Sequence, residues 1–135
     1  MKLSIALSAF LLMPIAASAA PNDSREVTDI STSWLALVDA HDYVKSWEAA
    51  STLLQGRVPK NLWVTEGPTR RDPLGTVQSR SVQNVQFVSS LPGAPEGQYA
   101  IVQFKTRFTQ KADAVETVTL VRENGIWKDA GYFIQ

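Results

Sequence analysis

Apolar side chains recur at three- and four-residue steps through the first half of the chain, a spacing typical of helices that bury one face. The first stripe consists of Val27, Ile30, Trp34, Val38 and His41. The second consists of Tyr43, Trp47, Ala50 and Leu54, with Asp42 as a possible N-cap and Gly56 as a stop signal. A third, shorter helix is expected to begin near Pro59, to carry Leu62 and Trp63, and to break at Gly67-Pro68.

Beyond residue 75 the pattern changes to alternating apolar and polar positions, which is typical of strands. We expect four strands, over residues 77–89, 99–109, 115–123 and 126–134. The alternation shifts within the first strand, which indicates a β-bulge. Asn124-Gly125 predicts a type I′ hairpin turn between the last two strands, and the Pro- and Gly-rich segment 91–97 predicts a longer turn after the first.

This order of elements predicts a single α+β domain over residues 20–135. Helices that precede a run of strands pack on one face of an antiparallel sheet. The expected architecture is therefore a set of N-terminal helices on a curved, four-stranded antiparallel meander sheet.

The hairpins assign side chains to the two faces of this sheet, provided that residues 110–113 form the loop after the second strand. The face toward the helices then carries Ala100, Val102, Phe104, Phe108, Val115, Val121, Ala130, Tyr132 and Ile134. On the outer face Glu116 pairs with Arg107 across the strands, and Asp129 lies nearby.

The outer face also carries five large apolar residues, more than a solvated sheet face usually has. They are Ile101, Val118, Leu120, Trp127 and Phe133. We hypothesise that they form a homodimer interface or a contact with another protein partner. The alternative is that they are scattered surface residues, screened by the stems of Lys105 and Arg122.

The N-terminus has the pattern of a cleaved signal peptide over residues 1–19. Lys2 precedes an apolar run from Leu3 to Ile15, and Ala17-Ser18-Ala19 forms a small-x-small cleavage site, which favours cleavage after Ala19. The chain has no cysteine, so a lipid anchor of the bacterial lipoprotein type has no attachment point. We therefore expect a periplasmic or secreted protein without a stable membrane anchor.

Composition narrows the chemistry that the domain can support. The absence of cysteine and the single histidine, His41, leave too few ligands for a zinc site and too few groups for a Ser/His or Cys/His pair. Without Lys2, 12 basic residues stand against 13 acidic ones, which gives no strongly basic face for nucleic acid. The sequence predicts no catalytic residues, no metal, no cofactor and no nucleic-acid partner.

Basic residues gather between positions 57 and 80, where five basic residues stand against two acidic ones. Arg70, Arg71 and Arg80, with Lys60 and Trp63, are candidates for binding a carboxylate, phosphate or sulfate, because guanidinium groups match these anions. Tyr132 is a second aromatic candidate for the same pocket. The alternative is that the arginines are solvated and pair with Glu66, Asp72 and the acidic first helices.

Several segments resemble one family over nearly the whole of residues 20–135. They are Trp34, Tyr43-x-x-Ser46-Trp47, Trp63, Arg71-x-Pro73-Leu74-Gly75, Leu91-Pro92-Gly93-Ala94-Pro95-Glu96-Gly97, Glu116-Thr117-Val118-Thr119-Leu120 and Gly125-x-Trp127-x-x-x-Gly131-Tyr132. The chain is similar to the bacterial exported proteins grouped as the domain-of-unknown-function 4019 family. Asp72 and Gly67-Pro68 depart from the family pattern. The resemblance implies a cystatin-like or nuclear-transport-factor-like cone, a sheet curled around a helix, and it assigns no activity to any residue.

The leading hypothesis is an exported, non-enzymatic binding or interaction module. The alternative is a small-molecule enzyme of the isomerase, dehydratase or hydrolase type that uses the pocket of the cone. A buried carboxylate with a raised pKa beside Tyr132 or Trp63 would favour the enzyme.

Overall fold

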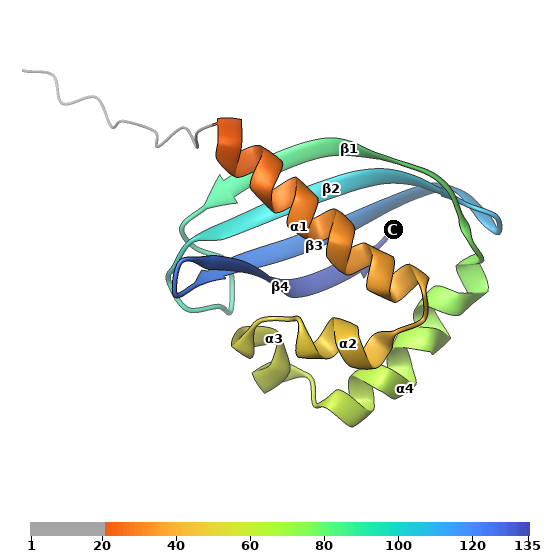
Figure 1. The fold of residues 1–135 in the computed structure, drawn as a ribbon, viewed down its shortest axis with the longest axis horizontal. Coiled ribbons are helices and arrows are strands. Elements are labelled where there is room, and N and C mark those ends of the chain that lie inside the picture. The colour runs from red at the N-terminus through yellow and green to blue at the C-terminus, as the bar shows by residue number, and fades with distance from the viewer. Residues whose placement is uncertain (1–20) are drawn as a thin grey trace, which may run out of the picture.

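The computed structural model describes residues 21–135, in which helices come first and a four-stranded sheet follows (Figure 1). The helices are α1 (Pro21–Asp39), α2 (Tyr43–Glu48), α3 (Thr52–Arg57) and α4 (Lys60–Arg71), followed by a 3₁₀ turn at Asp72–Leu74. The strands are β1 (Val77–Val88), β2 (Tyr99–Phe108), β3 (Lys111–Glu123) and β4 (Ile126–Ile134). The expected α+β class is confirmed, whereas the expected signal peptide lies outside the described residues.

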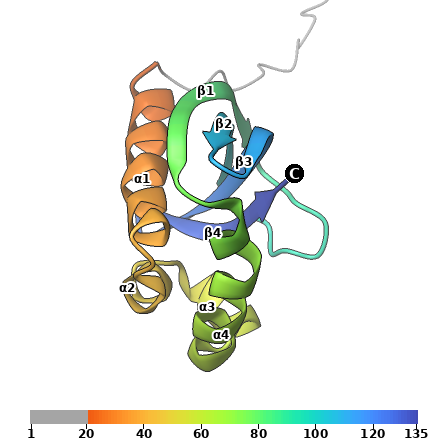
Figure 2. The same ribbon diagram turned by 90° about the vertical axis from the view of Figure 1, so that its right-hand side faces the viewer.

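Helix α1 lies along one face of the curved sheet, and the shorter helices gather beyond the β4 side (Figures 1 and 2). Its apolar stripe is buried, as the periodicity predicts: Val27, Trp34, Leu35 and Val38 are at most 4% exposed. These residues join inward side chains of the sheet in one core. The burial of this face stabilises α1 more than its intrinsic helix propensity does.

The second apolar stripe forms two helices and not one. Asp42 caps α2 by accepting a hydrogen bond from the Lys45 N–H, as expected. Ser51 then caps a new helix, because its hydroxyl accepts from the Leu54 N–H while its own backbone is extended. The chain therefore turns at Ser51, and Gly56 lies inside α3 and does not end it.

The predicted break at Gly67-Pro68 is wrong, since α4 continues through both residues to Arg71. A proline inside a helix removes one backbone hydrogen bond and usually costs about 3 kcal/mol. The packing of α4 against α2 offsets this cost, because the ring of Tyr43 lies directly against Gly67. A Cβ atom at position 67 would be only 2.7 Å from Cδ1 of Tyr43. The close approach of α2 and α4 thus requires glycine at this position.

The strands follow one another as an antiparallel meander in the order β1-β2-β3-β4, as predicted. Asn124 and Gly125 have φ angles of 51° and 79°, as a type I′ turn requires. Register shifts in β1 between Val77 and Ser79 and between Val82 and Asn84 confirm the predicted irregularity.

The expected loop at residues 110–113 is wrong, and this changes the faces of β3. Phe108 already pairs with Lys111, so the turn consists of residues 109–110 and β3 begins earlier. Phe104 faces Glu116 across the strands, and Val102 faces Val118. Glu116, Val118 and Leu120 are therefore completely buried under the helices, and Arg107 is not the partner of Glu116.

A β-bulge at Ala130 changes the alternation of β4. Leu120 pairs with Asp129, but Thr119 pairs with Gly131, which leaves Ala130 without an opposite residue. Trp127 and Asp129 precede the bulge, lie opposite Arg122 and Leu120 and point into the core, at 5% and 2% exposure. A shift of one residue moves every following side chain to the other face.

The outer apolar face on which the dimer hypothesis rested is correspondingly smaller. Val118, Leu120 and Trp127 belong to the core, so their assignment to the outer face is wrong. Ile101 is half-buried and Phe133 is 57% exposed. Val115 and Val121, expected on the face toward the helices, lie on the opposite face from Glu116, Val118 and Leu120, so this expectation is wrong. Val121 is nevertheless only 8% exposed; it pairs with Tyr99, whose hydroxyl donates to the Pro95 carbonyl oxygen in the turn before β2.

Candidate functional site

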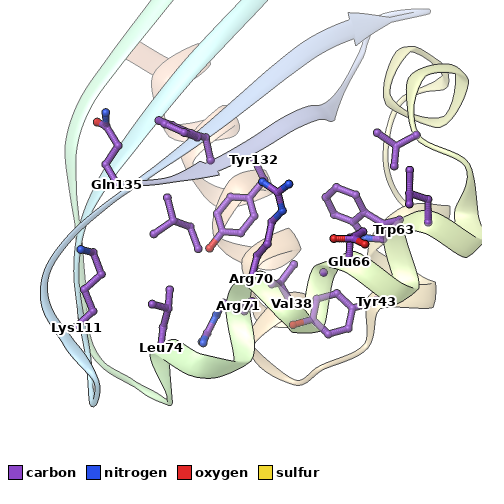
Figure 3. A pocket seen from close by; sticks show the side chains of 15 residues that line it. Val38, Tyr43, Trp63, Glu66, Arg70, Arg71, Leu74, Lys111, Tyr132 and Gln135 are labelled. Carbon is purple, nitrogen blue, oxygen red and sulfur yellow. The ribbon is translucent and has the colours of Figure 1, made fainter.

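A groove of about 650 Å³ lies between α4 and the C-terminal end of β4. Such a volume falls in the usual range for ligand sites. Its apolar lining consists of Val38, Tyr43, Val58, Leu62, Trp63, Gly67, Leu74, Phe133 and Ile134. Its polar lining consists of Glu66, Arg70, Arg71, Lys111, Tyr132 and Gln135 (Figure 3).

Trp63 and Tyr132 form the inner wall of the groove, and Trp34 packs behind both of them. The ring of Trp34 lies 6.0 Å from that of Trp63 and 5.4 Å from that of Tyr132, centroid to centroid. Both indoles are held by Ser46: Trp34 Nε1 donates to its carbonyl oxygen and Trp63 Nε1 to its hydroxyl, each at 2.9 Å. Ser46, in the Tyr-x-x-Ser-Trp segment of α2, therefore fixes the orientation of both indole rings.

Three charged side chains at the groove are available to a ligand. Arg70 extends from α4 toward β4, Lys111 lies near the end of β4, and Glu66 lies beside Trp63 (Figure 3). None of the ion pairs within residues 21–135 includes Glu66, Arg70 or Lys111. Among the side chains of this mouth, two cations therefore stand against one carboxylate.

Arg71, in contrast, is only 3% exposed and is bound to the protein itself. It donates to the Gly75 carbonyl oxygen at 2.6 Å and to Asp39 Oδ1 at 3.2 Å. Its guanidinium also lies 4.5 Å from the ring centroid of Phe108. Arg71 therefore fixes the end of α4 to the sheet, and it contributes little free charge to the groove.

Arg80 lies behind the groove in a buried network of charges. It donates to both oxygens of Asp39, at 2.7 and 3.1 Å, and to both oxygens of Glu116, at 2.8 and 3.2 Å. Burial alone lowers the pKa of Arg80, but the hydrogen bonds to the two carboxylates outweigh it and raise the pKa above its ordinary value. Arg80 is thus a permanent cation that neutralises buried acids.

Glu116 has every oxygen occupied although it is completely buried. Besides Arg80, it accepts from the Thr106 hydroxyl at 2.5 Å and from the Tyr132 hydroxyl. Burial, and then the charge and hydrogen bond of Glu116, raise the pKa of Tyr132 well above its ordinary value. The hydroxyl of Tyr132 therefore stays protonated and is committed to Glu116, while its ring lines the groove.

The structure brings together four of the six residues predicted for ligand binding. Trp63, Arg70, Arg71 and Tyr132 all line the groove, whereas Arg80 touches it only through Glu116 and Tyr132. Lys60 lies elsewhere and pairs with Glu48 at 2.8 Å.

Sequence reasoning missed Lys111 and the final residues of β4. The alternation pattern describes faces of a sheet, and this groove runs beside the edge of a strand. Only the register of the β2–β3 turn brings Lys111 next to the end of β4.

Two other buried groups lie away from this groove. Asp129 and Trp127 line a smaller cavity of about 340 Å³ against α1. Neither carboxylate oxygen of Asp129 nor Nε1 of Trp127 has a hydrogen-bond partner with good geometry in the described part of the chain. Burial raises the pKa of Asp129 well above its ordinary value, and the nearby Gly131 N–H offsets this only in part.

His41 lies at the corner after α1, outside the lining of the groove. Its φ of 61° is the left-handed conformation, and its Nδ1 lies 2.9 Å from Asp72 Oδ1, which also accepts from the Tyr43 hydroxyl. Asp72 therefore fixes the corner to the end of α4. Among residues 21–135, no group of three or more His, Cys, Asp or Glu side chains could hold a metal ion.

No helix in the described range is both long and apolar enough to cross a membrane.

Fold and groove together define a cone-like α+β domain with an aromatic-walled groove beside its last strand. The chain matches the family described as "Protein of unknown function (DUF4019)" over residues 30–132, and it belongs to that family. No curated protein shows a significant match to this sequence. The solved structure of Aln2 from a Streptomyces species is similar in fold, with a TM-score of 0.53, 12% identity, and coverage of 87% of this chain and 92% of Aln2.

Proposed function

We propose that this protein is an exported, non-enzymatic binding module. Its ligand presents an apolar body to the groove between α4 and β4 and an anionic group to Arg70 and Lys111. The observation that carries the proposal is the pair of cations without ion-pair partners in the described residues, beside an aromatic wall that the protein itself holds in place. Guanidinium groups that are not already paired are suited to carboxylates and phosphates.

The chemistry of the groove supports binding more than catalysis. A general acid or base must be able to exchange a proton with the substrate. Glu116, the buried carboxylate beside Tyr132, already accepts four hydrogen bonds and is shielded from the groove by that tyrosine. Glu66 lines the groove but is exposed on α4.

A matched pair of probes tests the proposal: 4-phenylbutyrate and its uncharged amide. We expect both to shift the NMR signals of Trp63 and Tyr132, and the acid to bind at least about fivefold more tightly, as a charge-assisted hydrogen bond predicts. Because Lys111 remains, Arg70→Gln should weaken the preference for the acid, and Arg70→Gln combined with Lys111→Gln should abolish it. Arg107→Gln removes an exposed cation of β2 and should leave the preference unchanged.

Equal binding of acid and amide by the unmodified protein would refute the role of Arg70 and Lys111. Signal changes away from the groove would refute the site itself. Export is tested separately by the mass of the protein recovered from the cell envelope, which should correspond to a chain beginning at Ala20.

A further inference from the structure

The groove follows the free edge of a strand. Tyr132, Phe133, Ile134 and Gln135 are consecutive and all line it. Successive side chains of a strand point to opposite faces, so a cavity that touches four in a row must run beside the strand and not over one face. β4 is the last strand in the order, so within the described sheet it has a neighbour only on the β3 side.

The hydrogen-bond pattern shows which backbone groups point into the groove. Val115 and Gln135 exchange both N–H···O bonds, at 3.0 and 2.9 Å, so Gln135 points its backbone groups toward β3. Such pairs alternate with pairs that point away from each other. Phe133 therefore also faces β3, whereas the N–H and C=O groups of Tyr132 and Ile134 face the groove.

The same edge is already used further upstream. The Ser51 N–H, just before α3, donates to the Asp129 carbonyl oxygen at 2.7 Å. From Tyr132 onward, no backbone hydrogen bond in residues 21–135 occupies the outward groups of the edge. Tyr132 and Ile134 therefore offer two donors and two acceptors, about 7 Å apart along the strand.

We infer that the ligand is an extended peptide segment that adds to this edge as a fifth strand and places a terminal carboxylate between Arg70 and Lys111. The inference rests on the proposed function and names its ligand class. An edge with free donors and acceptors supplies the backbone pairing, as in other complexes formed by strand addition. Leu62, which is 47% exposed, and Trp63 contact alternate side chains of the peptide.

The charged side chains along the groove favour one direction of the bound peptide. Lys111 lies near the end of β4, and Glu66 lies at the opposite end, beside Trp63 (Figure 3). A peptide whose carboxyl terminus lies at the Lys111 end meets a cation there and keeps its own negative charge away from Glu66. This charge complementarity distinguishes a carboxyl-terminal segment from an internal one.

Amide hydrogen exchange on the full mature protein provides the first test. The probe is a mixed pool of acetylated pentapeptides with Val, Ile or Leu at alternate positions and a free carboxyl terminus. We expect the amides of Tyr132 and Ile134 to exchange at least about tenfold more slowly with the pool present, and that of Phe133, already bonded to β3, to change little. Unchanged exchange at Tyr132 and Ile134 at millimolar peptide would overturn the inference.

A matched pair of variants separates this inference from the proposed function. Ile134→Pro removes a donor that faces the groove and leaves the β3 ladder intact, since proline is tolerated where an edge N–H points outward. Ile134→Ala removes the side chain and keeps the donor. We expect Ile134→Pro to bind the peptide pool at least about tenfold more weakly than Ile134→Ala, and both to bind 4-phenylbutyrate equally.

If both variants bind peptides equally while 4-phenylbutyrate still binds through Arg70, the groove is a small-molecule site and strand addition is wrong. The amidated peptide pool provides a further readout: it should bind about five- to tenfold more weakly than the free acid, and equal binding would contradict the terminal carboxylate. Should Ile134→Pro fail to fold, the exchange measurement on the unmodified protein decides alone.

Discussion

Two carboxylates, Glu116 and Asp129, are buried on the face of the sheet that the helices cover, and they differ in their hydrogen-bond partners. Glu116 accepts four hydrogen bonds, two of them from Arg80, so its charge is compensated. Asp129 is 2% exposed, and its two oxygens accept no hydrogen bond of good geometry within residues 21–135. A buried carboxyl without partners favours its neutral form, because desolvation penalises the charged one.

This difference predicts a pH dependence that belongs to Asp129. Its pKa is raised on folding, so the folded state keeps a proton that the unfolded state releases above its ordinary pKa of 3.8. The free energy of unfolding therefore contains a contribution that is fully present below pH 3.8 and is lost as pH rises from there toward the folded pKa, by about 1.4 kcal/mol per pKa unit of the shift.

Asp129→Asn should remove that contribution. We expect its melting temperature relative to the unmodified protein to increase as pH rises from 3.5 to 8, measured by circular dichroism. Asp113→Asn, at an exposed position of β3, serves as the control and should show no such trend. If the melting temperatures of Asp129→Asn and the unmodified protein change in parallel with pH, Asp129 is not the source of the pH-dependent stability.

The elements show what a single sequence can specify and what it cannot. Local signals were sufficient for the Asn124-Gly125 turn, for α1 and for the order of the strands. The faces of Glu116 and Trp127 were missed for one reason: the turn after β2 has two residues and not four, which inverts β3, and Trp127 pairs with Arg122 of that strand. The bulge after Asp129 then returns Tyr132 to the predicted face, opposite Val118. Neither the turn nor the bulge has a distinct local signature, and an error of one residue inverts a face.

The path of α4 was missed for a related reason. Gly67-Pro68 is a helix breaker by local rules, but Tyr43 approaches from another helix and packs on Gly67. Four of the six ligand candidates nevertheless meet in the groove, because α4 and β4 are adjacent in space. The free edge of β4 could not be predicted, since it depends on which strand has no neighbour.

The contact between α2 and α4 predicts a contrast between two glycines. Gly67→Ala places a methyl group 2.7 Å from the Tyr43 ring and should lower the free energy of unfolding by about 1–3 kcal/mol. Gly56→Ala, inside α3, meets nothing within 4 Å and should raise it by up to about 1 kcal/mol. Urea denaturation measures both, and equal effects would show that α2 and α4 do not pack closely.

At the scale of the whole molecule, a network of charges joins helices to the sheet. Asp39 of α1 binds Arg80 of β1 and Arg71 of α4, and Arg80 binds Glu116 of β3, which binds Tyr132 of β4. Its two arginines balance its two carboxylates. Removing one member of a buried pair leaves the partner charged and without compensation, which is costly.

Arg80→Met should therefore lower the free energy of unfolding by about 3–5 kcal/mol in urea denaturation. Lys60→Met breaks an exposed ion pair of similar length, Lys60–Glu48, and should cost less than about 1 kcal/mol. A small effect of Arg80→Met, comparable with that of Lys60→Met, would mean that the network is solvated.

The bulge at Ala130 has a consequence for evolution within the family. Before it, the outward backbone groups belong to odd-numbered residues such as Asp129, and after it to Tyr132 and Ile134. A relative that had lost one residue here would keep its strand but turn the opposite backbone groups and side chains toward α4. Insertions and deletions at this point of an alignment would therefore separate relatives that share this groove from relatives that share only the fold.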